Sequence, residues 1–372
     1  MKIGIVTWHK GNIGSTLQAY ALSETLRRLG HEPELINIIE NRFTPILTRL
    51  RSLAFHVCFL KSGLTRDNTH RFVANNIHES PPLLYDELKD YSKKFDAVIC
   101  GSDQIWSCQY AVNPYYFLQF VPAGKRIAYA PSVGFRKIKD EFQSDYIKAV
   151  SSIPFLSVRE ETGARVIHDL TGLSPKVVLD PTFLLSADDW LSLTQDVTLQ
   201  KFGLKKENFI LCYYLGNHKL YEDYTRRVAE KLGMRPVYVS FKRKNFGRDQ
   251  LVCTIGEFLA LIRDSRCILT DSFHCTIVPL NMGKKVAVFE RFSNDDPFSQ
   301  NSRIYDALKK FEAEDWIVSP SDGVETFLNR QDDHARIQSL LEIERKDSLS
   351  YLRDSLLKVQ GTASSPSEQK QA

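Results

Sequence analysis

Polar side chains follow several short apolar runs of this sequence, at points where strands are expected to end. The apolar run CILT stops before DSFHC, so Ser272 and His274 come at the start of the next helical pattern. A histidine flanked by hydroxyl groups at a helix start can transfer a proton near neutral pH, because the imidazole titrates in that range. The alternative is a structural histidine packed among its neighbours, and the local pattern does not separate the two.

A second polar group follows the apolar run DAVIC. The next letters, GSDQIW, place Ser102, Asp103 and Gln104 directly after a buried strand. Asp103 can orient a sugar hydroxyl or take a proton from it. The competing interpretation makes Asp103 the N-cap of the following helix.

Arginines supply the candidates for binding an anion. Arg159 ends the run FLSVRE, and a guanidinium there suits phosphate or carboxylate because it bonds two oxygens at once. Its alternative is an ion pair with Glu160 or Glu161. Arg291 in VFERF and Arg303 in NSRIYDAL are further anion-binding candidates, unless they are solvated surface charges.

The segment HKGNIGST after the first apolar run offers another place for an anion. Gly11 and Gly14 permit a tight turn, Asn12 is polar, and a helix N-terminus supplies free N–H groups. The glycine spacing matches neither the dinucleotide fingerprint nor the phosphate loop of nucleotide triphosphatases. The alternative is an ordinary turn in which Ser15 caps the helix.

Alternation of short strands with longer helices must position these residues. In the first part of the chain, IGIVTW leads into an amphipathic helix over residues 15–29, Gly30 ends it, and PELINI, DAVICGS, RIAYAPS, FLSVRE and KVVLDP follow as strands. A second series contains FILCYYLG, RPVYVSF, CILTDS and KKVAVFE. The pattern predicts an α/β fold with two parallel sheets and a cleft at the carboxyl ends of their strands.

The same pattern gives the expected domain boundaries. A chain of 372 residues is too large for one comfortable core. We therefore expect an N-terminal domain over residues 1–200, a C-terminal domain over 201–330, a helical segment over 331–360 and a disordered tail over 361–372.

Composition narrows the classes of function. A net charge of only +4 without a basic block argues against nucleic-acid binding. Seven cysteines without the spacing of zinc or redox pairs indicate reduced thiols and a cytoplasmic protein. No leader peptide is expected at MKIGIVTW, and no run approaches the roughly 20 apolar residues of a membrane span. The stretch over residues 43–60 is interpreted as a packed helix, with a helix on a membrane surface as the alternative.

Metal-dependent catalysis is not expected. No cluster of carboxylates or histidines has the spacing of a metal cage, and no strand ends in the Asp-x-Asp pattern of metal-dependent sugar transferases. We therefore predict transfer without a metal ion.

Taken together, the motifs resemble those of the polysaccharide pyruvyl transferase family. GNIGSTLQAYAL, FDAVICGSDQIW, YFLQFVPAGKRIAYAPSVG, FLSVREETGARVI with KVVLDPTFLL, and TDSFHCTIVPLNMGKKVAVFER occur in the family's order over roughly residues 1–315. One position departs from the pattern, because Cys275 stands where the family commonly has glycine after Ser-Phe-His. A side chain there would narrow the backbone approach to a phosphate.

The resemblance implies two facing Rossmann-like domains, as in the GT-B glycosyltransferases, with a C-terminal helix returning to the first. It implies phosphoenolpyruvate as donor, no further cofactor, and a saccharide or lipid-linked oligosaccharide acceptor in glycan or exopolysaccharide biosynthesis. A lipid-linked acceptor would bring a cytoplasmic protein to the inner face of the membrane.

On this basis His274 and Asp103 are the expected catalytic residues, with His274 transferring the proton and Asp103 acting on the acceptor hydroxyl. Arg159 and Arg303 are expected to clamp the donor. The remaining expected substrate-binding residues are Asn12, Gly14, Ser102, Gln104, Ser272 and Arg291. The alternatives are a nucleotide-sugar-dependent glycosyltransferase on the same fold, or an inactive glycan-binding relative.

Overall fold

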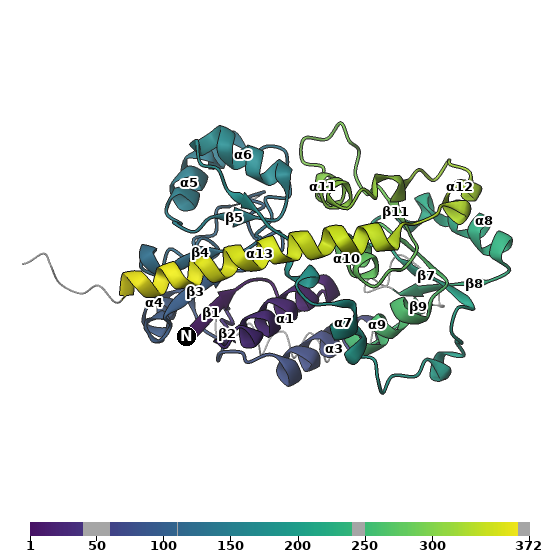
Figure 1. The fold of residues 1–372 in the computed structure, drawn as a ribbon, viewed down its shortest axis with the longest axis horizontal. Helices are drawn as coiled ribbons and strands as arrows, with labels where there is room; N and C mark the ends of the chain where they lie inside the picture. Colours follow the sequence, from purple (N-terminus) through teal and green to yellow (C-terminus); the bar gives the residue numbers. More distant parts are fainter. Residues whose placement is uncertain (40–59, 110, 240–249, 364–372) are drawn as a thin grey trace, which may run out of the picture.

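A computed structural model describes residues 1–39, 60–109, 111–239 and 250–363. Most of the helix expected over residues 43–60 lies outside these residues. The N-terminal half carries strands β1 to β6 and the C-terminal half carries β7 to β12, and one long helix lies along both (Figure 1).

The N-terminal half is built on a four-stranded parallel sheet in the order β2-β1-β3-β4. Its strands are β1 (Lys2–Val6), β2 (Glu32–Leu35), β3 (Ala97–Cys100) and β4 (Arg126–Ala128). The pairing of Val6 with Cys100, and of Cys100 with Ala128, places the carboxyl ends of three strands at one edge. A short parallel pair, β5 (Ser157–Val158) with β6 (Lys176–Val177), follows in the chain.

The C-terminal half is built on a six-stranded sheet in the order β12-β11-β10-β7-β8-β9, in which every pairing is parallel. Its strands are β7 (Phe209–Tyr213), β8 (Arg235–Val239), β9 (Gln250–Leu251), β10 (Cys267–Thr270), β11 (Val286–Phe289) and β12 (Ile317–Val318). The central strands β7, β10 and β11 are buried along their whole length, as expected for a sheet covered on both faces.

Helices connect the strands in both halves. In the N-terminal half these are α1 (Ile13–Arg28), α3 (Leu60–Asn76), α4 (Leu88–Tyr91), α5 (Asp140–Ser151), α6 (Glu161–Thr171) and α7 (Ala187–Ser192). In the C-terminal half they are α8 (Glu222–Leu232), α9 (Ile255–Asp264), α10 (Phe273–Asn281), α11 (Ser302–Lys310) and α12 (Val324–Asn329). No helix in the described part of the chain is long and apolar enough to cross a membrane.

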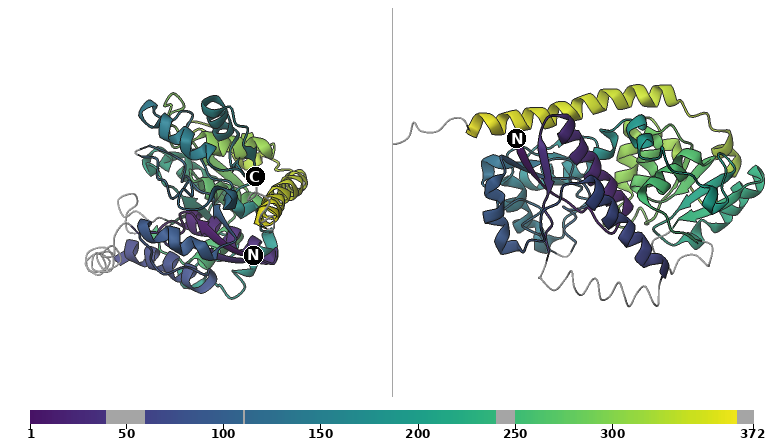
Figure 2. Two further views of the ribbon diagram at one scale, coloured as in Figure 1. Left: turned by 90° about the vertical axis from the view of Figure 1, so that its left-hand side faces the viewer. Right: turned by 90° about the horizontal axis from the view of Figure 1, so that it is seen from below.

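The last helix, α13 (His334–Ala363), ties the two halves together (Figures 1 and 2). Near its start, Ile337 and Leu341 join an apolar core that is built mainly from the C-terminal half and also contains Ile13 and Leu17 of α1. Farther along, Leu352, Leu356 and Val359 join the core under the first sheet, beside residues of β1. One amphipathic helix therefore contributes to both cores.

The α/β architecture with two parallel sheets and a C-terminal helix is confirmed. The first helix runs over Ile13–Arg28, two residues earlier at its start than expected. Two short strands, β9 and β12, were not expected from the sequence. The C-terminal helix extends to Ala363, three residues into the segment expected to be disordered, and the remaining tail lies outside the described residues.

Candidate functional site

Groups from both halves converge on the carboxylate of Asp180. This residue follows β6 and caps a short 3₁₀ helix, η4 (Pro181–Phe183), where its Oδ1 accepts hydrogen bonds from the Thr182 backbone N–H at 3.0 Å and hydroxyl at 2.8 Å. Its Oδ2 accepts hydrogen bonds from Ser102 Oγ and from Arg159 Nη1, each at 2.8 Å. His274 Nε2 lies 3.7 Å from the same oxygen, an ion-pair distance rather than a hydrogen bond.

The electrostatics of this cluster favour an ionised Asp180. Burial alone raises the pKa of Asp180, but His274 and the Arg159 guanidinium outweigh it and hold that pKa well below its ordinary range. The pKa of Arg159 shows the matching effect. Burial lowers it, but the negative charges of Asp180 and Glu160 raise it by more, so the pKa of Arg159 is raised overall. Arg159 and Asp180 therefore form a buried, charged pair.

His274 is held against the first turn of α1. Its side chain is 12% exposed, and a Cβ atom on residue 14 would lie 2.6 Å from Cγ of the imidazole and closer still to Nδ1. Only glycine permits this approach between an element of the N-terminal half and the start of α10 in the C-terminal half. Gly14 is thus a packing partner of His274.

The hydroxyl and thiol beside His274 have local partners. Ser272 is the N-cap of α10, and its Oγ accepts a hydrogen bond from the Cys275 N–H at 3.4 Å. Cys275 belongs to the apolar core of the C-terminal half, and burial raises the pKa of its thiol to about 12. The side chain at this departure from the family pattern is therefore packed in the core.

The start of α1 differs from the expected helix start. Asn12, not Ser15, is the N-cap, and its side chain accepts from the Gly14 N–H at 2.8 Å, so the alternative with Ser15 as cap is wrong. The Gly11 N–H donates to Thr69 Oγ1 at 3.1 Å. Two backbone donors expected to be free for an anion are therefore already used.

Ser15 instead donates to Asp103. The distance from its Oγ to Asp103 Oδ2 is 2.5 Å, and Asp103 Oδ1 accepts from the Gln104 N–H at 2.8 Å. Asp103 has a φ of 78°, a left-handed conformation that aspartate tolerates better than most residues. No helix begins after it, so the interpretation as a helix N-cap is wrong. The carboxylate is 6% exposed at the carboxyl end of β3.

Two arginines flank the ring of Phe273 in the first turn of α10. The guanidinium carbon of Arg159 lies 4.2 Å from the ring centroid and that of Arg303 lies 5.8 Å from it. Arg303 is 6% exposed and donates to the backbone and side-chain oxygens of Gln300 at 3.2 and 3.1 Å. Burial, with the positive charges of Arg159 and Arg291, lowers the pKa of Arg303 to about 9.

This arrangement leaves arginine nitrogens buried without an acceptor. Within the described residues Arg303 forms no ion pair with a carboxylate, and Arg159 Nη2 has no hydrogen-bond partner. Arg159 Nε lies 3.6 Å from Glu160 Oε2, so the expected alternative of an ion pair with Glu160 is also present, without a hydrogen bond. Arginine N–H groups buried without acceptors are costly, and an anionic ligand would supply the missing acceptors.

Three expected binding residues make no hydrogen bond to Asp180, Ser102, Arg159 or His274 in the described structure. Arg291 donates from Nη2 to the Asp271 backbone oxygen at 2.7 Å, which anchors it to the end of β10. The side chain of Gln104 lies beside Gly134, and its amide nitrogen would be 3.0 Å from a Cβ atom placed on that glycine. Asn12 is exposed and occupied as a cap. The structure thus brings together Gly14, Ser102, Arg159 and His274, with Arg303 across the Phe273 ring.

Asp180 and Phe273 were not selected from the sequence. The letters VVLDP carried a usable signal, because an aspartate that ends a buried strand lies at the edge where ligands bind. Phe273 carried none, since a phenylalanine in an apolar helix is expected to be core. Among the described residues, no group of three or more His, Cys, Asp or Glu side chains could hold a metal ion.

Comparison with protein families gives one match. The model described as polysaccharide pyruvyl transferase matches residues 12–294, which include Gly14, Asp103, Arg159, Asp180 and His274. No curated protein matches the chain.

Solved structures show the same fold at low identity. A putative UDP-N-acetylglucosamine 2-epimerase from Listeria monocytogenes has a TM-score of 0.57 at 11% identity, over 100% of this chain and 99% of that one. UDP-GlcNAc 2-epimerase from Methanocaldococcus jannaschii has a TM-score of 0.53 at 11% identity, over 88% and 91%. UGT89C1 from Arabidopsis thaliana, complexed with UDP, has a TM-score of 0.50 at 10% identity, over 95% and 99%. The expected GT-B architecture is confirmed.

Proposed function

Because this chain belongs to the polysaccharide pyruvyl transferase family, we propose that it transfers pyruvate from phosphoenolpyruvate to two hydroxyls of a sugar, forming a ketal and releasing phosphate. The acceptor is a saccharide or a lipid-linked oligosaccharide of a glycan or exopolysaccharide pathway. Cytoplasmic action, with a lipid-linked acceptor reached at the inner face of the membrane, is part of the same proposal.

The observation that carries this proposal is the pair of buried guanidinium groups around Phe273, next to His274. Arg159 and Arg303 approach the same ring from different elements, and both arginines are buried, at 6% exposed each. A three-carbon molecule with a phosphate and a carboxylate carries two anionic groups that would match two such cations. Asp180 fixes Arg159 in place through its 2.8 Å contact.

The chemistry requires one proton delivered and two removed. A proton adds to the methylene carbon of phosphoenolpyruvate, and one sugar hydroxyl attacks the carbon that bears the phosphate and loses its proton. The second hydroxyl then displaces phosphate from this carbon, which closes the ketal and releases the second proton. The site must therefore supply an acid, a base and cations for the leaving phosphate.

We assign proton transfer to His274, which Asp180 and Gly14 hold in a defined orientation. Arg159 and Arg303 would bind the donor, and the hydroxyls of Ser102 and Ser272 would add neutral contacts. Asp103 would orient or deprotonate the acceptor hydroxyl, with Ser15 fixing one of its oxygens. Substitution of Asn12, Gln104 or Arg291 is expected to change activity less, because these residues make no hydrogen bond to this cluster.

The test is an assay of phosphate release from phosphoenolpyruvate across a panel of glycans, with the product identified by mass. A product heavier by a pyruvate ketal supports the proposal. Release of a nucleoside diphosphate from a sugar nucleotide, without turnover of phosphoenolpyruvate, would instead identify a glycosyltransferase. Donor binding with no turnover on any acceptor would favour an inactive relative. We further propose that the reaction needs no metal, and activity lost to a chelator and restored by added metal would contradict this.

A further inference from the structure

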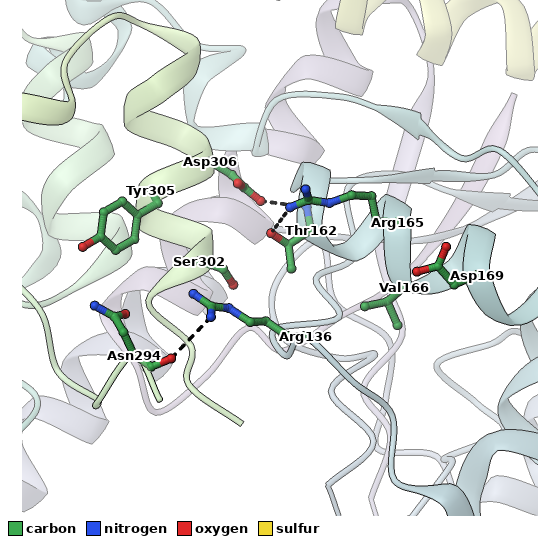
Figure 3. Close-up of a pocket in the computed structure, with 9 residues that line it drawn as sticks. All are labelled: Arg136, Thr162, Arg165, Val166, Asp169, Asn294, Ser302, Tyr305 and Asp306. Atoms are coloured by element: carbon green, nitrogen blue, oxygen red, sulfur yellow. Dashed lines mark hydrogen bonds between the residues drawn. The ribbon is translucent and has the colours of Figure 1, made fainter. Parts of the chain in front are cut away.

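A cavity of about 500 Å³ lies between the two halves, beside the Asp180 cluster but lined by other residues (Figure 3). The N-terminal half contributes Arg136 and, from α6, Arg165 and Asp169, whereas the C-terminal half contributes Asn294, Ser302 and Tyr305. The halves are joined at its wall, where the Thr162 N–H donates to Asp306 Oδ2 at 2.8 Å. Its volume is that of a site for a small ligand.

Two cations face this cavity with unused donors. Arg136 donates from Nη1 to the Asn294 backbone oxygen at 3.3 Å, and Arg165 donates from Nη2 to Thr162 Oγ1 at 3.2 Å. In the described part of the chain, neither guanidinium forms an ion pair with a carboxylate at 4.0 Å or less. Each therefore keeps several N–H groups that an oxyanion could accept from.

An independent observation points to a ligand. Ser302, the first residue of α11, is 5% exposed and lines the cavity, yet its Oγ has no hydrogen-bond partner in the described structure. A buried hydroxyl without a partner is uncommon and costs free energy. A hydroxyl-bearing ligand in the cavity would supply that partner.

The lining is that of a polyol site rather than an apolar one. Apart from Val166 and the ring of Tyr305, it consists of groups that donate to or accept from hydroxyls, and Asp169 offers a carboxylate as acceptor. Ser302 and Arg303 are consecutive on α11, so one turn of this helix carries both a residue of the cavity and the arginine assigned to the donor.

We propose that this cavity binds the acceptor as an anionic saccharide, with its acidic group between Arg136 and Arg165 and its hydroxyls on Ser302, Asn294 and Asp169. The identification of the ligand as the acceptor rests on the proposed function, whereas the existence of the binding site does not depend on it. The acidic group is an oxyanion that could be a phosphate or a carboxylate of the sugar.

The experiment measures dissociation constants by calorimetry for three probes, glucose 1-phosphate, glucuronic acid and methyl glucoside, with and without phosphoenolpyruvate. The expected result is binding of at least one anionic probe that phosphoenolpyruvate does not displace, and weaker binding of the neutral glucoside. The anionic probe that binds distinguishes phosphate from carboxylate. Equal affinity for the neutral glucoside, or no binding of either anion, would overturn the proposal.

Charge-removing variants locate the binding. Arg136→Gln and Arg165→Gln should each weaken the anionic probe about tenfold, the effect of losing one hydrogen bond to a charged group. Lys137→Gln is the matched control, because it removes the same charge at the next position in the sequence. Lys137 does not line the cavity and pairs with Asp140. An equal loss in Lys137→Gln, or none in the arginine variants, would remove the site from this cavity.

The same variants separate this inference from the proposed function. Phosphoenolpyruvate should bind the Arg136→Gln protein as it binds the wild type, because the donor cluster is untouched. Turnover of phosphoenolpyruvate with no effect of either arginine on the anionic probe would leave the function standing and the cavity assignment wrong. Binding of the anionic probe that depends on the arginines, without any turnover of phosphoenolpyruvate, would support the binding site and contradict the proposed function.

Discussion

At the scale of single residues, Asp180 is the point where groups of the candidate site from both halves meet. Its two oxygens accept from Thr182, Ser102 and Arg159, and the side chain is 1% exposed. Breaking a buried ion pair on one side leaves the other charge without compensation, which costs about 3–5 kcal/mol. Asp180 is therefore expected to matter for stability as well as for the orientation of Arg159 and His274.

The Asp180→Asn variant should be less stable by about 3 kcal/mol or more at neutral pH, because it leaves Arg159 buried without its carboxylate. The folded-state pKa of Asp180 lies below its unfolded value, so this stabilisation is fully present above about pH 4 and is lost as pH falls through the folded pKa. Denaturant unfolding of both proteins measures the difference, which should stay constant from about pH 5 to 8 and narrow in acid. A difference that grows in acid would contradict an ionised Asp180.

His274→Ala should lower kcat by about 10²–10⁴, the usual contribution of a general acid or base. The side chain is 12% exposed and packs against Gly14, so its loss should lower the unfolding midpoint only modestly. Steady-state assays of phosphate release measure the first effect and calorimetry the second. A folded His274→Ala protein with wild-type kcat would exclude His274 from proton transfer.

Arg303 gives the donor site a dependence on alkaline pH. Its pKa is lowered to about 9, so its positive charge is present below that pH and lost above it. Because kcat/KM follows ionisations of the free enzyme, kcat/KM for phosphoenolpyruvate should fall as pH rises through about 9. In Arg303→Gln the value should be lower throughout and this alkaline fall should disappear. An unchanged profile in the variant would show that Arg303 does not bind the donor.

The sequence located individual residues by one rule, that side chains after buried strands share an edge. The rule found Ser102, Arg159 and His274, which do meet. It did not find that their meeting point is Asp180, because the partners lie 78 and 21 residues away in the chain and such contacts leave no local pattern. Local capping rules explain only the Oδ1 atom of Asp180, which accepts hydrogen bonds from Thr182. For α1 the same rules offered Ser15 as the cap, whereas the cap is Asn12.

At the scale of elements, the approach of α1 to α10 is the contact that matters most for the site. Gly14 is a poor helix former by about 1 kcal/mol relative to alanine, yet it lies in the first turn of α1 because His274 occupies the space of a side chain. The identity of this residue is set by a neighbouring element and not by the helix that contains it.

Gly14→Ala should therefore lower turnover with little loss of stability. The added methyl group must displace the imidazole, and misplacing a catalytic group by about 1 Å can cost about 10²-fold in rate. Gly124→Ala is the matched control, since no atom lies within 4 Å of a Cβ at that glycine. Equal kcat values for the two variants would show that the imidazole accommodates the methyl group.

The longer elements were predictable and the shortest ones were not. Strands of four or five buried residues, such as β3, β7 and β10, carry enough apolar periodicity to be recognised. The strands β9 and β12 have two residues each, too few for any period, and exist because the neighbouring edge of the sheet provides partners.

At the scale of the whole molecule, the contacts that join the two halves include that of Gly14 with His274, the bond of Thr162 to Asp306, and α13. Amphipathic pattern predicted a C-terminal helix, and the family resemblance predicted its return to the first half. The cavity beside α11 was not predictable, because it depends on how two separately folded surfaces face each other.

Removing a buried leucine of α13 tests how tightly the halves are coupled. Leu352→Ala should lower the free energy of unfolding by about 2–5 kcal/mol, because Leu352 is 0% exposed in the core beneath the first sheet. Leu357→Ala on the same helix is the control, since Leu357 is 63% exposed. Urea unfolding followed by fluorescence measures both. Similar small losses in the two variants would show that α13 rests on the N-terminal half without stabilising it.

The placement of α13 also fixes an order of events during synthesis. Ile3 and Ile5 share their core with Leu352, Leu356 and Val359, which are synthesised long after them. The sheet that forms first therefore keeps part of one apolar side uncovered until α13 has been translated. A nascent polypeptide in that condition is a natural client for chaperones, and one stalled before α13 would present the same uncovered side to proteases.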